Sequence, residues 1–134
     1  MDRRQFIVLS ALAISPRVTR VTRAVHPLGP HPEPRAGITA AKIPATADLT
    51  HKSAAHTFDQ VRQIPQIVDG IHCHCGCGEN PDFYSLLSCY EGKEAMAQHC
   101  AICLGQGRLA FSLSREGKSL AEIRIAIDEE YGDR

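Results

Sequence analysis

The chain has 134 residues, of which 43% are hydrophobic and 22% charged, and this suits one folded domain with flanking segments. Its 15 Lys and Arg balance 15 Asp and Glu. Because a net charge of zero creates no strong field toward nucleic acid, we expect no nucleic-acid partner. All 6 Cys lie between positions 73 and 103, which indicates one local site.

Residues 1–25 have the pattern of a twin-arginine export signal. Arg3 and Arg4 precede an apolar run, residues 6–14, that is far shorter than the ~20 residues of a membrane-spanning helix. We therefore expect the twin-arginine export machinery to be a partner and the mature chain to have no membrane-spanning segment. The expected location is the periplasm or another extracytoplasmic space, where an uncleaved signal can act as an anchor. A disordered basic tail is the alternative.

Residues 26–57 form a proline-rich linker in this interpretation, because they hold five of the chain's 8 prolines among small and polar residues. Such a stretch buries too little apolar surface to offset the entropy lost on ordering. We expect its histidines, His26, His31, His51 and His56, to be solvated, with weak metal binding as the alternative.

Residues 58–134 carry helical periodicity and no convincing strand pattern. Apolar residues from Phe58 to Val68 recur at helical spacing, and Pro65 predicts a kink within them. Further helices are expected at about 82–90 and 94–115, and a capping box at Ser119 predicts a last helix. The fold class is therefore all-α: a small bundle of three or four short helices, stapled through Cys and His, behind a disordered N-terminal segment.

The cysteines and neighbouring histidines are spaced as metal ligands. Thiolate and imidazole select Cu(I), Zn(II) or iron–sulfur centres over Mg²⁺ or Ca²⁺. Of these, we expect Cu(I) or Zn(II) as the cofactor. The candidate ligands are Cys73, Cys75, Cys77, Cys100, Cys103, His99, His74, His72 and Cys89.

The spacing explains how distant ligands could meet. On one helix, Cys100 and Cys103 would share a face, and His99 lies four residues before Cys103. The loop cysteines would project to one side if extended, and Gly76 lets that loop turn around an ion. For Cys89, a buried apolar role is an equal alternative.

The sequence leaves alternatives open for the histidines and for the redox state of the site. His72 and His74 are either ligands or partners that orient ligands. His99 is either a ligand or a residue of the helix surface. Export leads to an oxidising compartment, so disulfides are the main rival of metal, with 15 connectivities for six Cys.

Cys73, Cys75 and Cys77 are expected to be too close together in sequence to pair easily with one another. The other alternative is thiol–disulfide exchange through Cys100 and Cys103. No Cys–His–Asn arrangement for hydrolysis stands out, so a binding protein is favoured over an enzyme.

The segment of residues 72–78, HCHCGCG, resembles the signature of the exported bacterial proteins with a PCYCGC motif. The likeness covers residues 61–132 and keeps the order of all six Cys. It implies the family's folding unit and cysteine site, and no established activity. His72 and His74 stand in place of the motif's Pro and Tyr. Phe83 and Tyr84 stand where the family tends to place a His, so that residue's role is not carried over.

The sequence thus predicts an exported metal-binding protein for metal trafficking or storage, with an exchange protein and a disulfide-stapled partner-binding module as alternatives.

Overall fold

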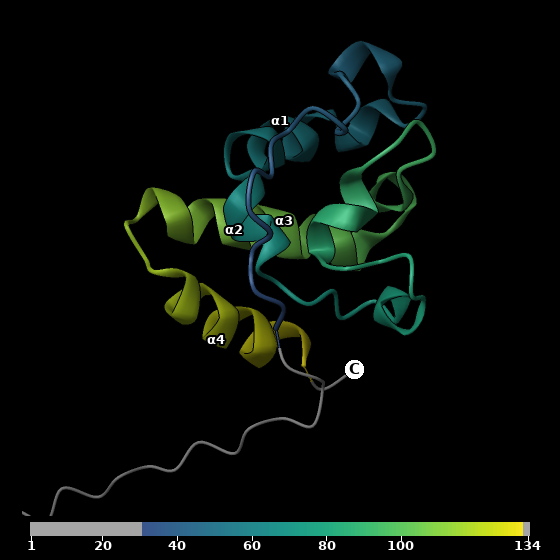
Figure 1. Ribbon diagram of the computed structural model, residues 1–134. Coiled ribbons are helices and arrows are strands. Elements are labelled where there is room, and N and C mark those ends of the chain that lie inside the picture. The colour runs from purple at the N-terminus through teal and green to yellow at the C-terminus, as the bar shows by residue number, and fades with distance from the viewer. Residues whose placement is uncertain (1–30, 133–134) are drawn as a thin grey trace, which may run out of the picture.

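The computed structural model describes residues 31–132, and this part of the chain is helical without strands (Figure 1). The α-helices are α1 (Ala55–Gln63), α2 (Pro65–Asp69), α3 (Ala101–Arg115) and α4 (Leu120–Tyr131). The described residues also form five 3-10 helices. Before α1 come η1 (Thr46–Asp48) and η2 (Lys52–Ala54), and between α2 and α3 come η3 (Cys77–Glu79), η4 (Leu86–Tyr90) and η5 (Met96–His99). The all-α prediction is confirmed.

Helix α3 is the centre of the fold, and α1 and α4 pack against it (Figure 1). The core is a single cluster that includes Phe58, Leu86, Tyr90, Ile123 and Ile127, all fully buried. Within the described range, no helix is long and apolar enough to cross a membrane.

Local signals placed several helix ends correctly. Pro65 starts α2 directly after the non-helical Ile64, which produces the predicted break. The capping box that precedes α4 is present. The Ser119 N–H donates to Glu122 Oε2 at 2.8 Å, and the Glu122 N–H donates to Ser119 Oγ at 3.3 Å.

Two predicted helices are shorter than expected. The helix predicted at 82–90 is only the 3-10 segment η4, because Ser85 and Ser88 form a reciprocal cap at its start. The helix predicted at 94–115 is interrupted at Cys100, whose backbone is extended (φ −115°, ψ 108°). Cys100 is the N-cap of α3 and not a residue inside the helix, so Cys100 and Cys103 do not share a helical face as predicted.

The segment before Phe58 differs from the linker prediction. Ile43 and Leu49 are buried core residues, and η1 and η2 lie within this segment. Arg35 also forms an ion pair with Asp69 of α2. Composition averages over a window and so missed a few well-placed apolar and charged side chains. The predicted export signal, residues 1–25, lies outside the described residues, as does His26.

Gly107 allows the aromatic ring of Tyr90 to approach the backbone of α3. A Cβ at Gly107 would collide with the Tyr90 hydroxyl, which donates to the buried Cys103 carbonyl at 2.6 Å. We expect Gly107→Ala to lower the free energy of unfolding by about 1–3 kcal/mol, because the collision outweighs alanine's better helix propensity. Urea denaturation followed by circular dichroism measures this. Ser112→Ala, at an exposed position of α3, changes propensity alone, and an equal effect of both variants would contradict the collision.

Candidate metal centre

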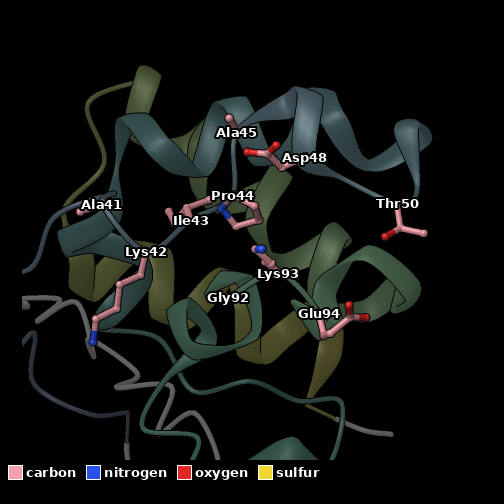
Figure 2. Close-up of a pocket in the computed structure, with 10 residues that line it drawn as sticks. All are labelled: Ala41, Lys42, Ile43, Pro44, Ala45, Asp48, Thr50, Gly92, Lys93 and Glu94. Carbon is pink, nitrogen blue, oxygen red and sulfur yellow. The ribbon is translucent and has the colours of Figure 1, made fainter.

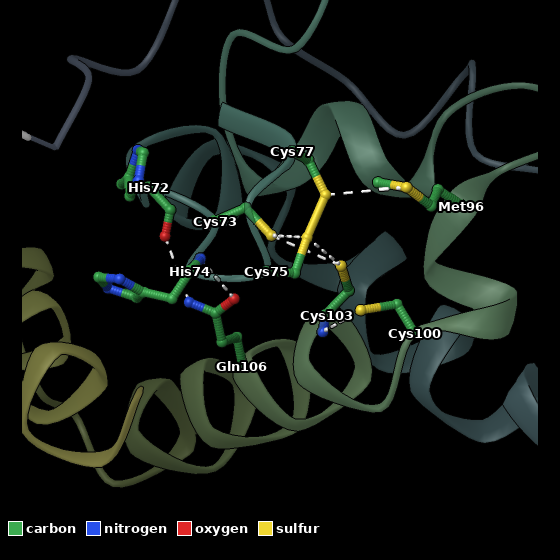
Figure 3. The surroundings of a disulfide bond; sticks show 9 residues. All are labelled: His72, Cys73, His74, Cys75, Cys77, Met96, Cys100, Cys103 and Gln106. Carbon is green, nitrogen blue, oxygen red and sulfur yellow. Dashed lines mark hydrogen bonds between the residues drawn. A yellow bond between two sulfur atoms is a disulfide. The ribbon is translucent and has the colours of Figure 1, made fainter. Parts of the chain in front are cut away.

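Five cysteine sulfurs from three parts of the chain meet in the interior. Figure 3 draws Cys73, Cys75, Cys77 and Cys103 of this group, together with the neighbouring Cys100. Cys73, Cys75 and Cys77 come from the loop after α2 and the start of η3, Cys89 from η4 and Cys103 from α3. Their Sγ atoms all lie within 4.8 Å of one another. We call this group the sulfur cluster. Cys73, Cys89 and Cys103 are buried, whereas Cys75 and Cys77 are half-buried at its outer side.

Gln106 of α3 fixes the loop that carries three of these cysteines. Its fully buried side chain accepts from the His74 N–H and donates to the His72 carbonyl, both at 3.2 Å. Because side chains alternate along an extended segment, Cys73 faces the cluster while His72 and His74 face away from the sulfurs (Figure 3). The Gln106 side chain of α3 therefore holds the loop so that its cysteine side chain points to one face and its two histidine side chains point to the other.

The sulfur–sulfur distances are close to those of a thiolate metal site. Cys73 Sγ lies 3.1 Å from Cys75 Sγ and 3.5 Å from Cys103 Sγ, and Cys103 and Cys75 are also 3.5 Å apart. Metal–sulfur bonds of about 2.3 Å at tetrahedral angles place sulfurs about 3.8 Å apart. The donor set therefore fits a soft ion after small movements. Met96 Sδ adds a further sulfur 3.7 Å from Cys77 Sγ.

Cys75 and Cys77 form a disulfide, which the sequence interpretation had judged difficult. That interpretation was wrong, because Gly76 adopts a left-handed conformation (φ 89°) that turns the chain between them. The two Cα atoms are 5.6 Å apart, within the range that a disulfide needs. The other four cysteines are free thiols.

The three buried thiols differ in their preference for the charged state. Hydrogen bonds from Cys103 and then Cys89 lower the pKa of Cys73 to about 3. The bond to Cys73, the contact with Cys89 and burial together raise the pKa of Cys103. The bond with Cys103 alone would lower the pKa of Cys89, but its bond to Cys73 and its burial raise it. Cys73 is thus the thiol that ionises most readily, and a nearby cation would favour ionisation of the other two.

The remaining predicted ligands lie outside the sulfur cluster. His99 is exposed in η5, and its ring packs on that of His51 with centroids 4.1 Å apart. The break at Cys100 ends the helical spacing that would have aligned His99 with Cys103. Cys100 is half-buried, and its Sγ accepts a long hydrogen bond of 3.5 Å from the Cys103 N–H.

The two loop histidines take part in a separate network. The His74 side chain is 1% exposed, and its Nε2 lies 2.8 Å from Asp128 Oδ1 of α4. The same carboxylate bonds His31 Nε2 at 3.0 Å, and His31 Nδ1 accepts from the His72 N–H at 3.0 Å. His31 was expected to be solvated, but its side chain is only 13% exposed, because this segment packs against α4. Sequence spacing gave no sign of this pairing.

A surface hollow lies elsewhere on the molecule, between residues 41–50 and the turn at Gly92 (Figure 2). Lys42, Asp48, Lys93 and Glu94 are its charged lining residues. The hollow includes no cysteine or histidine, so it belongs to a different region from the sulfur cluster.

Comparison with known protein families identifies the family to which the chain belongs. A family model for a protein of unknown function with PCYCGC motif matches residues 35–134. No curated protein and no solved structure matches the chain. The match begins at Arg35, before the predicted boundary at Phe58, and it spans the whole sulfur cluster. By its sequence and its cysteine site, the chain belongs to the PCYCGC-motif family.

Proposed function

We propose that this protein binds a soft transition-metal ion, Cu(I) or Zn(II), outside the cytoplasm and serves metal trafficking or storage. The observation that carries the proposal is the convergence of five sulfurs within 4.8 Å. Three of them are buried free thiols that cannot all ionise together without a compensating cation. Arg3 and Arg4 support export, which a reporter fusion with both residues changed to Lys would test by loss of translocation.

The redox state of Cys75 and Cys77 sets how many sulfurs are available. With the disulfide closed, Cys73, Cys89 and Cys103 supply three thiols, a number that suits trigonal Cu(I). With the disulfide reduced, Cys75 and Cys77 add two ligands, and a four-thiolate site for Zn(II) becomes accessible.

Metal content of the full-length chain, purified under argon with a phosphine reductant, tests this function. We expect a near-integer amount of copper or zinc per chain, and loss of at least 80–90% of it in Cys103→Ser and Cys89→Ser, because each removes a buried ligand. Cys100→Ser is the matched control, since Cys100 lies outside the sulfur cluster and should keep its metal. Equal metal content in all three variants, or none in the parent chain, would refute the proposal.

Thiol–disulfide exchange is the second candidate function. The contact between Cys73 and Cys75 favours it, and not the expected pair of Cys100 and Cys103. Cys103 is fully buried, and the pKa of its thiol is raised, so Cys103 is poorly suited to attack a substrate. Cys73 Sγ instead lies 3.1 Å from the disulfide sulfur of Cys75. Attack there would form a Cys73–Cys75 bond, break the Cys75–Cys77 bond and release Cys77 as thiolate. Disulfide mapping by mass spectrometry after rapid acid quenching would detect the exchanged bond.

A further inference from the structure

The face of the loop opposite to the sulfur cluster carries a second set of metal-ligating groups. His72 and His74 lie on it with ring centroids 5.3 Å apart and planes at 80°. His74 Nδ1 is buried and has no hydrogen-bond partner. A buried nitrogen without a partner costs free energy, and such groups in native proteins often mark a ligand that completes them.

Asp128 orients His74 as carboxylates orient metal-binding imidazoles. Its Oδ1 accepts from His74 Nε2 at 2.8 Å, which places the ring proton on Nε2 and leaves a lone pair on Nδ1. His31 holds the carboxylate from the other side with contacts of 3.0 and 3.1 Å. His31 is not itself a ligand here, because its Nδ1 already accepts from a backbone N–H. Asp128 is therefore a positioning residue.

The separation of the two rings fits one shared ion. Metal–nitrogen bonds of about 2.0–2.1 Å at a tetrahedral angle place two imidazole centroids about 5.2 Å apart. The observed separation of His72 and His74 is 5.3 Å. His72 is only half-buried, so solvent reaches the proposed site from the side of His72 and can supply the remaining ligands as water.

We propose that His72 and His74 form a second metal site, which binds a divalent ion that prefers imidazole, Zn(II) or Cu(II), separately from the sulfur cluster. The PCYCGC motif has Pro and Tyr at these two positions, so the site belongs to this chain and not to the motif. The chain would then hold a nitrogen site and a sulfur site on opposite faces of one loop, each suited to a different class of ion.

Zn(II) titration of the reduced, untagged full-length chain tests the second site. Long-range ¹⁵N–¹H spectra report each histidine ring nitrogen separately. We expect His74 Nδ1 and one ring nitrogen of His72 to shift with added Zn(II), and His74→Tyr, which restores the motif's residue, to remove the His72 shift. Asp128→Asn should weaken this site about 10–100-fold. Glu130→Gln, an equal charge change at an exposed position of α4, should leave it unchanged.

The outcomes separate this inference from the proposed function. Shifts of His72 and His74 that persist in Cys103→Ser support an independent second site, even if the sulfur cluster binds nothing. Ring nitrogens that stay unshifted over several equivalents of Zn(II) overturn it, even if the sulfur cluster binds metal. An unchanged Zn(II) affinity in Asp128→Asn, in a protein with parental circular dichroism, overturns the positioning role.

Discussion

Arg35→Leu is expected to lower the free energy of unfolding by about 3–5 kcal/mol, a large fraction of the stability of a small domain. Arg35 Nη2 lies 2.8 Å from Asp69 Oδ1, and Arg35 Nε lies 3.2 Å from Asp69 Oδ2. The Asp69 side chain is fully buried. The substitution would leave its carboxylate with the Ser85 hydroxyl and the backbone N–H of residue 35 as partners, which do not neutralise its charge. Urea denaturation at pH 7 measures the loss.

The pH dependence of that loss distinguishes a missing ion pair from missing packing. Burial alone would raise the pKa of Asp69, but hydrogen bonds from Arg35 and Ser85 outweigh it and lower the pKa below its ordinary 3.8. A lowered pKa in the folded state stabilises the protein above pH ~4, and this contribution disappears as the pH falls further. The difference between Arg35→Leu and the parent should therefore be full at pH 7 and smaller at about pH 3, below the ordinary pKa of 3.8. A constant difference would contradict the ion-pair explanation, and Arg108→Leu, at an exposed position, should change little at either pH.

Arg35 also shows which feature of the fold could not be predicted from the sequence. Composition around residues 26–57 predicted an unfolded linker, because proline and small residues dominate this stretch. Whether it folds depends on single long-range contacts, such as Arg35 with Asp69 across 34 positions, which no local window contains. Periodicity and capping work within one element, so they found the regions of α1, α2 and α4.

The kind of site, a cluster of cysteines, could be predicted from the sequence. The spatial arrangement of its residues could not. The clustering of cysteines at 73–103 identified the sulfurs that meet, including Cys89, whose role was open. His99 was assigned by helical spacing, and this failed because the chain is extended at Cys100. The separation of His72 and His74 from the sulfurs follows from alternation in the loop, but Asp128 as their partner is 54 residues from His74. Only tertiary packing brings it there.

Gln106→Leu is expected to affect both stability and metal binding, because one buried amide holds the whole cysteine loop. Leucine has a similar volume but would leave the His74 N–H and the His72 carbonyl without their partner. An unsatisfied buried polar group costs about 1–3 kcal/mol, so we expect a loss of about 2–4 kcal/mol after partial relaxation of the loop. Gln63→Leu, at an exposed position of α1, is the control and should cost less than about 0.5 kcal/mol.

The metal affinity of Gln106→Leu tests whether the register of the loop matters for the sulfur cluster. Cys73 lies between the two backbone groups that Gln106 holds. Its Sγ must stay near Cys103, which belongs to α3 as Gln106 does. Releasing the loop adds conformational freedom that metal binding must then remove, so we expect the affinity for Cu(I) or Zn(II) to fall at least tenfold. Competition with a chromophoric chelator measures this in conditions where the variant is fully folded. An unchanged affinity would mean that the sulfurs assemble around the ion by themselves, and that α3 contributes Cys103 but not the order of the loop.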